Sequence, residues 1–197
     1  VEFQIAGGVD GIVPVGTTGE SPTLRTPEHL KVIEVVTAKA AGRCKIIAGT
    51  GANSTDEAME LTAACKAFGV DGTLQVTPYY NKPTQEGLFR HYKEIADCTA
   101  LPIILYNVPG RTGVNLEPKT VARLADERCG IIGVKEASGN VAQMTEIIAQ
   151  VPDDFVLLSG DDPIAVAVMA IGGHGLISVA SNAAPAEMVQ IIELCER

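Results

Sequence analysis

The sequence has few cationic side chains and no long apolar run. Its 197 residues carry 15 Lys and Arg against 24 Asp and Glu, a formal net charge of −9. Nucleic acids and anionic membrane surfaces are bound through basic side chains, which this balance does not favour. The longest apolar stretches, such as residues 165–171, are far shorter than the roughly 20 residues of a membrane span. We therefore expect neither a nucleic acid nor a membrane as a partner.

Targeting signals and cysteine pairs are lacking as well. The N-terminus has no basic region followed by an apolar one, so it does not read as a signal peptide. The five Cys are odd in number, widely spaced and without a C-x-x-C pair, which indicates reduced thiols in a cytoplasmic protein. The first residues lack an initiator Met and read as the inside of a helix, so we expect an incomplete chain.

Two common kinds of site have no motif in the sequence. His29, His91 and His174 do not have the spacing of metal ligands, and H-E-x-x-H does not occur, so we expect no metal. Gly49-Thr50-Gly51 lacks the third Gly of a dinucleotide-binding loop, and G-x-x-x-x-G-K-[ST] is not present. The sequence therefore gives no support to a nucleotide-binding fold of the Rossmann type.

Seven short apolar runs alternate with helical patterns along the whole chain. The runs are rich in β-branched residues and do not alternate strictly with polar ones, as in parallel strands covered on both faces. They span residues 11–15, 45–48, 72–76, 103–106, 131–135, 155–158 and 175–179. Helices are predicted over residues 27–41, 54–68, 85–98, 118–125, 141–149, 163–170 and 185–195. Repeated strand–helix units predict a parallel sheet.

Such a sheet can be an open, doubly wound sheet or a closed (β/α)8 barrel. Polar residues follow nearly every strand, among them Thr17, Tyr80, Arg111 and Glu136. A site built from the carboxyl ends of many strands, at the mouth of the barrel, is typical of the closed form. We therefore predict an α/β fold: a (β/α)8 TIM barrel, forming a single domain over residues 1–197, with seven strands visible and the first one missing.

Lys135 is the most informative single residue. It ends the apolar run 131–135, where a charged ammonium group is costly unless it is paired or its pKa is lowered. A desolvated, neutral amine can attack a carbonyl group and form a Schiff base. The alternative is a Lys at a strand end that reaches solvent or pairs with Glu136 or another nearby carboxylate.

Hydroxyl groups follow three other strands. Gly16-Thr17-Thr18-Gly19-Glu20-Ser21 offers hydroxyls and backbone amides that could hold a carboxylate, or could satisfy one another within a turn. Tyr79 and Tyr80 lie side by side in a loop, and Tyr106 closes a buried strand. A buried tyrosine hydroxyl needs a partner, which Thr17 or Tyr80 could supply, and such a chain could relay protons. The alternative is that each Tyr only covers an edge of the core.

Charged residues also follow two of the predicted strands. Arg111 lies in the loop after the strand that ends at Tyr106. Its planar guanidinium suits a substrate carboxylate, although an exposed Arg without a ligand fits the sequence equally well. After Gly160, Asp161 and Asp162 are expected to cap the following helix.

Four segments, taken together, are specific for one family. They are Gly16-Thr17-Thr18-Gly19-Glu20-Ser21, Thr77-Pro78-Tyr79-Tyr80-Asn81, Tyr106-Asn107-Val108-Pro109-Gly110-Arg111-Thr112-Gly113 and Gly133-Val134-Lys135-Glu136-Ala137. In this order and spacing they resemble the 4-hydroxy-tetrahydrodipicolinate (dihydrodipicolinate) synthases of the pyruvate-dependent class I aldolase superfamily. The resemblance covers essentially the whole chain. It implies condensation of pyruvate with L-aspartate 4-semialdehyde in lysine and diaminopimelate biosynthesis, without a metal or an organic cofactor.

The resemblance also implies a role for each matching residue. Lys135 would form the Schiff base with pyruvate, and Tyr106 would shuttle protons through Thr17 and through Tyr80 of a neighbouring subunit. The residues expected to bind or line the substrate pocket are Thr18, Arg111, Gly160 and Ile177. Those that match the lysine-binding residues of feedback-inhibited members are Ser21, His29, Asn53, Glu57 and Tyr79.

The resemblance extends to assembly, and it leaves two other functions open. It implies a homodimer or homotetramer, with a first barrel strand before Val1 and a C-terminal helical domain after Arg197, neither of which the sequence contains. One alternative function is cleavage of N-acetylneuraminate or of a 2-keto-3-deoxy sugar acid, although Arg111 in its Arg-Thr-Gly context favours the synthase. The other is a catalytically silent, truncated barrel.

Overall fold

The computed structural model describes residues 1–127 and 129–196, and its strands form one parallel sheet. The strands are β1 (Gly11–Ile12), β2 (Lys45–Gly49), β3 (Gly72–Val76), β4 (Ile103–Asn107), β5 (Ile131–Glu136), β6 (Val156–Ser159) and β7 (Gly175–Leu176). Each strand pairs with the next one along the chain. Pairing in chain order excludes the doubly wound alternative, in which the strand order reverses at a switch point.

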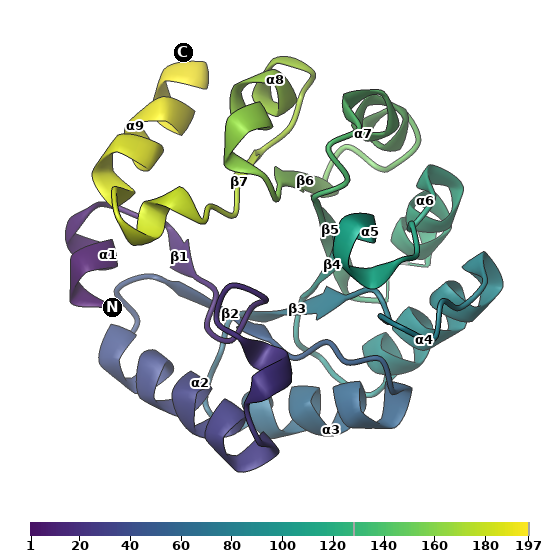
Figure 1. Cartoon of the computed structure of the whole chain (residues 1–197), viewed down its shortest axis with the longest axis horizontal. Coiled ribbons are helices and arrows are strands. Elements are labelled where there is room, and N and C mark those ends of the chain that lie inside the picture. Colours follow the sequence, from purple (N-terminus) through teal and green to yellow (C-terminus); the bar gives the residue numbers. More distant parts are fainter. Residues whose placement is uncertain (128, 197) are drawn as a thin grey trace.

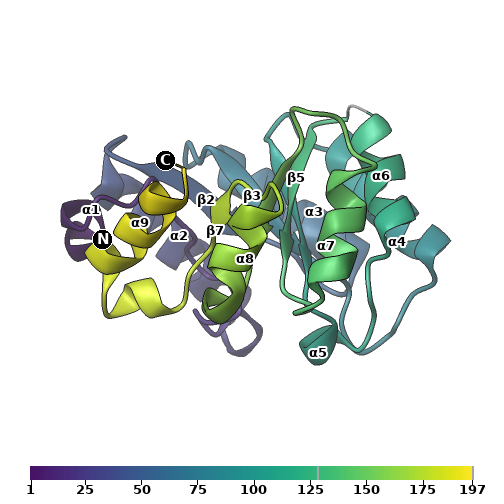
Figure 2. The ribbon, with the colours of Figure 1, turned by 90° about the horizontal axis from the view of Figure 1, so that it is seen from above.

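Helices cover the outer side of the curved sheet, as Figure 1 shows. They are α1 (Glu2–Ala6), α2 (Thr26–Ala40), α3 (Thr55–Lys66), α4 (Gln85–Asp97), α6 (Pro118–Asp126), α7 (Val141–Ile148), α8 (Ala165–Ala170) and α9 (Pro185–Cys195). The short helix α5 (Pro109–Thr112) instead lies at one end of the sheet, beyond the carboxyl end of β4 (Figure 2). Within the described part of the chain, no helix is long and apolar enough to cross a membrane.

The sheet forms most of a ring, with β1 and β7 as its two edge strands. Figure 1 shows these strands facing each other across an open side, with α1 and α9 beside one another. Gln4 on α1 donates a side-chain hydrogen bond to the carbonyl of Ser181 at 2.8 Å, and Gly7 packs against Pro185. The α/β fold with a parallel sheet in barrel order is therefore confirmed, and the part of it seen here is an open ring of seven strands.

The predicted strands and helices are all present, but several ends differ. β1 stops at Ile12 rather than at residue 15, because Pro14 has no N–H for a strand ladder and Val15 has a left-handed backbone with φ +55°. The helix predicted from residue 163 begins as a 3₁₀ turn over Asp162–Ile164. Helix α5 was expected as a loop; it begins at Pro109, a residue that suits the first turn.

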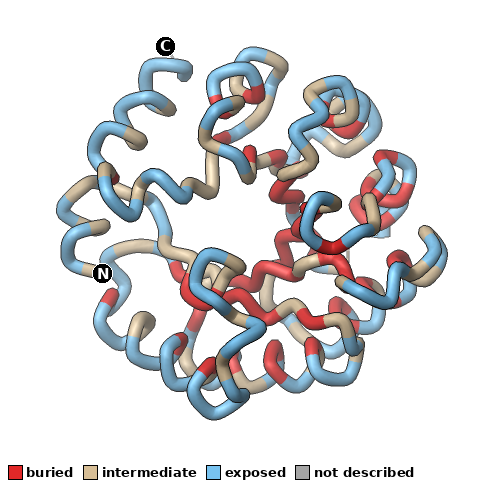
Figure 3. Tube along the Cα trace, viewed as in Figure 1, coloured by how far each residue is buried: buried red, intermediate tan, exposed pale blue. Residues whose placement is uncertain are grey.

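Burial is uneven around the ring. Figure 3 shows the buried residues concentrated along β2–β6, whereas the described residues of α1 include none and those of α9 only Pro185. On the outer side, the core between β3–β6 and helices α4, α6 and α7 contains fully buried side chains such as Leu105, Val134 and Leu157. The best-packed part of the fold therefore holds β4 and β5, which carry Tyr106 and Lys135.

Candidate functional site

Tyr106 on β4 and Lys135 on β5 lie side by side on the inner side of the ring. Their Cα atoms are partners in the β4–β5 register, and the Lys135 Nζ lies 4.2 Å from the centroid of the Tyr106 ring. Both residues are buried, with exposed fractions of 9% for Lys135 and 6% for Tyr106. The structure thus joins an amine and a phenol that are 29 residues apart in the sequence, at the mouth of the ring.

Burial shifts the pKa of Lys135 in the direction that a nucleophile needs. It lowers the pKa from 10.5 to about 8, and the nearby Arg111 cation acts in the same direction, whereas the Asp162 carboxylate raises it. A substantial fraction of the amine is therefore neutral near pH 8. Glu136 does not compensate the charge, because both of its carboxylate oxygens accept hydrogen bonds from other groups. The alternative that Lys135 pairs with Glu136 is wrong.

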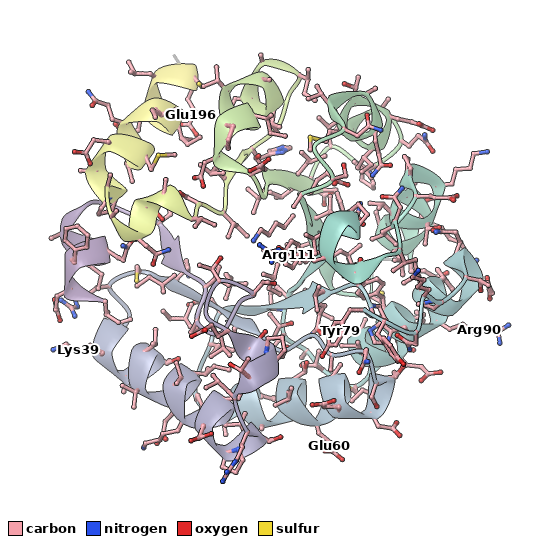
Figure 4. All side chains as sticks on the ribbon, viewed as in Figure 1. Lys39, Glu60, Tyr79, Arg90, Arg111 and Glu196 are labelled. Carbon is pink, nitrogen blue, oxygen red and sulfur yellow. The ribbon has the colours of Figure 1, made fainter. Side chains whose placement is uncertain are left out.

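Tyr106 has Thr17 and Arg111 as neighbours. Burial raises the pKa of the Tyr106 hydroxyl, while the nearby Thr17 side chain and the charge of Arg111 both lower it. Arg111 lies on α5 and reaches over the open centre of the ring, as Figure 4 shows. The segment after β1, strand β4 and the helix that follows β4 therefore bring Thr17, Tyr106 and Arg111 to the end of the ring where Lys135 lies.

Gly160 and Ile177 line the inner side near Lys135. A Cβ atom added to Gly160 would lie 3.0 Å from Lys135 Cε and 2.7 Å from Ala137 Cβ, closer than carbon atoms normally approach. Only a glycine therefore fits against this lysine. Ile177 is partly buried against an inner apolar cluster that includes Tyr106.

Thr18 and Tyr80 differ from Lys135 and Tyr106 in being exposed. Thr18 is exposed, and the Tyr80 side chain is 89% exposed, so it does not pack against the buried Tyr106 of its own chain. Of the two partners considered for Tyr106, the structure therefore provides Thr17. Tyr80 also has a left-handed backbone with φ +74°, a conformation that costs a non-glycine residue roughly 1–3 kcal/mol.

Asp162 does not cap the helix that follows it, so that prediction is wrong. Its carboxylate accepts a hydrogen bond from the Ser178 hydroxyl at 2.5 Å, and from the backbone N–H groups of Val179 and Ala180 at 3.0 and 3.1 Å. Three donors from the chain after β7 outcompete the helix start. The local pattern Asp161-Asp162-Pro163 gave no signal for this contact, which spans 16 to 18 residues.

A cavity lies outside the ring, between the turn after β1 and helices α2 and α3. Ser21, His29, Glu57 and Tyr79 line this cavity of about 80 Å³, and Asn53 donates to the Tyr79 carbonyl at 3.3 Å. The structure therefore gathers the five residues proposed for lysine. Ser54 caps α3 by accepting from the Glu57 N–H, so the Glu57 carboxylate is not needed for the cap.

In residues 1–127 and 129–196, no group of three or more His, Cys, Asp or Glu is arranged to hold a metal ion. That the reaction needs neither metal nor cofactor stays a prediction.

Comparisons with known proteins agree on one family. A model described as the dihydrodipicolinate synthetase family matches residues 1–197. The 4-hydroxy-tetrahydrodipicolinate synthase of Citrifermentans bemidjiense is 56% identical over 193 residues, which are 98% of this chain and 66% of that protein. The chain thus spans about two thirds of the length of such relatives.

Solved structures give the same result. Dihydrodipicolinate synthase from Aquifex aeolicus matches with a TM-score of 0.97 and 48% identity, over 99% of this chain and 67% of that one. The chloride-inhibited dihydrodipicolinate synthase from Acinetobacter baumannii, complexed with pyruvate, matches with a TM-score of 0.96 and 50% identity over the same shares. The chain belongs to the dihydrodipicolinate synthetase family.

Proposed function

We propose that the protein condenses pyruvate with L-aspartate 4-semialdehyde to 4-hydroxy-tetrahydrodipicolinate, a step in lysine and diaminopimelate biosynthesis. The observation that carries the proposal is the contact between Lys135 Nζ and the Tyr106 ring, 4.2 Å from its centroid, on the buried inner side of the ring. A lysine whose pKa is about 8 supplies the neutral amine for imine formation. The identity to a synthase over 98% of the chain supports this pair of substrates.

The reaction begins at Lys135. Its amine attacks the keto carbon of pyruvate, and the carbinolamine loses water to form an imine. Loss of a proton from the methyl group gives an enamine, which adds to the aldehyde carbon of the second substrate. The amino group of that substrate then attacks the imine carbon, closes the ring and releases Lys135. Tyr106, with Thr17, would move the protons of these steps.

The remaining residues would bind the two substrates. Thr18 would bind the carboxylate of pyruvate. Gly160, which packs closely against Lys135, and Ile177 would line the pocket beside the lysine. Arg111 would bind the carboxylate of aspartate semialdehyde, because its guanidinium reaches over the mouth from α5 (Figure 4).

We infer a complete eight-stranded barrel for the whole protein, with residues 1–197 as part of that one domain. The support is the open side between β1 and β7, since a further strand there would remove two exposed sheet edges. The active unit would be at least a homodimer, either alone or within a homotetramer, with Tyr80 entering the partner's site. Its exposure and its strained backbone support this role. The free cysteines suit the cytoplasm.

We further propose that the cavity formed by Ser21, His29, Glu57 and Tyr79 binds lysine as a feedback inhibitor. The Glu57 carboxylate suits an ammonium group. Asn53, which contacts Tyr79, suits a carboxylate. This proposal concerns regulation only, and the catalytic proposal does not depend on it.

Borohydride trapping tests the catalytic proposal. Reduction in the presence of pyruvate should attach a stable three-carbon adduct to Lys135, located by mass spectrometry of peptides. Lys135→Ala should remove the labelling, and Lys119→Ala, which changes an exposed lysine on α6, should not. Labelling that persists in Lys135→Ala contradicts the assignment. Comparing kcat/KM for aspartate semialdehyde with that for N-acetylmannosamine, the aldol partner of N-acetylneuraminate, tests the substrate.

A further inference from the structure

Directly behind Tyr106 and Lys135, on the outer side of the sheet, lies a buried group of polar side chains. We call it the outer cluster: Asn107, Asn115, Glu136 and Gln143. Asn107 and Glu136 have no exposed surface. Because successive residues of a strand point to opposite faces, these two side chains are the outer neighbours of Tyr106 and Lys135.

The Glu136 carboxylate is the centre of the outer cluster. Its Oε2 accepts hydrogen bonds from Asn107 Nδ2 at 2.9 Å and from Gln143 Nε2 at 3.0 Å. Its Oε1 accepts from the Ser138 backbone N–H at 2.7 Å. Both oxygens therefore act as acceptors, and all three donors are neutral N–H groups.

The remaining bonds fix the orientation of each amide. The Leu116 backbone N–H donates to Asn107 Oδ1 at 2.9 Å, so the Asn107 amino group must face Glu136. Asn115 accepts from Asn107 at 2.9 Å and donates to Gln143 at 2.8 Å. The cluster is thus a closed network in which each partner has one arrangement.

Nothing in the described chain neutralises Glu136 by an ion pair: the salt bridges found in residues 1–127 and 129–196 involve other acids. A buried carboxylate is costly, and apolar side chains of similar volume usually stabilise a fold at least as well. The cost points to a role in specifying geometry rather than in stability.

The network connects the three segments that carry the proposed catalytic and binding groups. The Cα partners Tyr106 and Lys135 are followed by the partners Asn107 and Glu136 in the same register. The hydrogen bond between Asn107 and Glu136 therefore also fixes Tyr106 and Lys135 relative to each other, one residue back along the two strands. Asn115 follows the helix that carries Arg111, so that segment is held by the same network.

We propose that Glu136 is a positioning residue: its carboxylate holds the ends of β4 and β5 in the arrangement that sets Lys135 against Tyr106, with the Arg111 segment tied to both. The inference rests on the proposed function for the chemical role of Lys135. Its geometric content, that Glu136 controls the surroundings of the Lys135 amine, is independent of any substrate.

Glu136→Gln is the informative substitution, because it preserves the size of the side chain and changes one acceptor into a donor. The new amino group would face either the Ser138 N–H or the amino groups of Asn107 and Gln143. In each case two donors meet, and the end of β5 must move. Gln143→Ala is milder, since it removes one donor and leaves the bonds from Ser138 and Asn107.

The test measures how the reactivity of the Lys135 amine depends on pH, in the absence of pyruvate. Trace acetylation over a range of pH, followed by mass spectrometry of peptides, gives the pH midpoint at which Lys135 becomes reactive. We expect a midpoint near 8 in the original chain. In Glu136→Gln it should move upward by about one unit toward the ordinary lysine value, because water reaches the amine. Gln143→Ala should move it less, in the same direction. Asp162 and Arg111, the charges that act on Lys135, stay unchanged.

Two controls separate positioning from a loss of stability. Glu60→Gln removes an exposed carboxylate on α3. Leu124→Ala weakens the outer core at a fully buried residue on α6, outside the cluster. Neither should move the Lys135 midpoint, although Leu124→Ala lowers the melting temperature. In Glu136→Gln, trapping of pyruvate should also slow at least tenfold.

The proposal fails if either folded cluster variant keeps the original Lys135 midpoint, or if Leu124→Ala shifts it equally. Gln143 is only partly buried, so we expect Gln143→Ala to fold. This variant therefore tests the proposal if Glu136→Gln does not fold. If the original chain is acetylated as expected but never trapped by pyruvate, the proposed function fails while the positioning result stands.

Discussion

Replacing Gly160 by Ala perturbs the proposed site with a single methyl group. The added Cβ would lie 2.7 Å from Ala137 Cβ, 3.0 Å from Lys135 Cε and 3.2 Å from the Glu136 carbonyl oxygen. Carbon atoms pack at about 3.5–4.0 Å, so the neighbours must give way by about 0.5–1 Å. The Lys135 side chain can move aside, whereas the contacts with Ala137 and the Glu136 carbonyl are relieved only by a shift of the backbone. Both movements displace the Lys135 amine.

The magnitude follows from that displacement. Overpacking of this size costs about 1–3 kcal/mol of folding free energy, which a circular-dichroism melt will show. Misplacing a reacting atom by about 1 Å costs on the order of 10²-fold in rate. We therefore expect pyruvate trapping at Lys135, followed by borohydride reduction and mass spectrometry, to slow about 100-fold in Gly160→Ala.

The control is Gly110→Ala on α5, where an added Cβ meets no atom within 4 Å. It should trap pyruvate at the original rate. A folded Gly160→Ala that traps pyruvate within twofold of the original rate would refute the reasoning, because the methyl group would then leave the Lys135 amine where it was.

Four further outcomes are expected. Arg111→Ala should lower kcat/KM for aspartate semialdehyde roughly 10- to 100-fold, the loss of about 1.5–3 kcal/mol from a charge-assisted hydrogen bond, and leave pyruvate trapping intact; an equal loss of trapping would contradict this role. Inactive Tyr80→Phe and Tyr106→Phe chains, mixed and allowed to exchange subunits, should regain activity, since a mixed dimer has one intact site; no recovery despite exchange would place Tyr80 in its own chain's site. Isothermal titration calorimetry should show lysine binding that Glu57→Gln weakens, and no heat from the original dimer would exclude the regulatory site. Burial lowers the pKa of His91 from 6.5 to about 4, so the unfolded chain binds its proton first and stability should fall by about 3 kcal/mol between pH 6.5 and pH 4; urea unfolding of His91→Gln should lack this part of the fall.

The sequence predicted the elements that form uninterrupted apolar runs. β4 and β5 were predictable because Ile103–Asn107 and Ile131–Glu136 are buried along almost their whole lengths. The end of β1 was predictable in part, because Pro14 cannot donate to a strand ladder. The left-handed backbone of Val15 was not predictable, and it occurs where the chain approaches Gly49 closely: an added Cβ on Gly49 would lie 2.2 Å from the Val15 carbonyl oxygen. A close approach of two segments leaves no periodic signal in either of them.

The site was predictable where a reactive side chain stands at the end of an apolar run. It was missed where a residue's partner comes from a segment far away in the sequence. Lys135 and Tyr106 lie next to the last residues of buried strands, and the resemblance of their motifs assigned them together. Glu136 ends a buried strand, yet alternation puts it on the opposite face, where its partner Gln143 comes from a helix. Asp162 resembled a helix cap because it stands just before a helical pattern. Its actual hydrogen-bond donors, around Ser178, follow another strand. Local patterns do not contain such partners.

The uneven burial of the ring has a consequence for how residues 1–197 open on their own, without the further strand that we infer between β1 and β7. Backbone hydrogen exchange proceeds through local unfolding, and segments with few buried side chains open at the lowest free energy. The seam between α1 and α9 is such a segment, since its described residues bury little besides Pro185 and are joined by the bond from Gln4 to Ser181. Fluctuations should therefore expose the amides of this seam long before those of β4 and β5. Lys135 and Tyr106 would keep their mutual geometry while the opposite wall of the ring opens and closes.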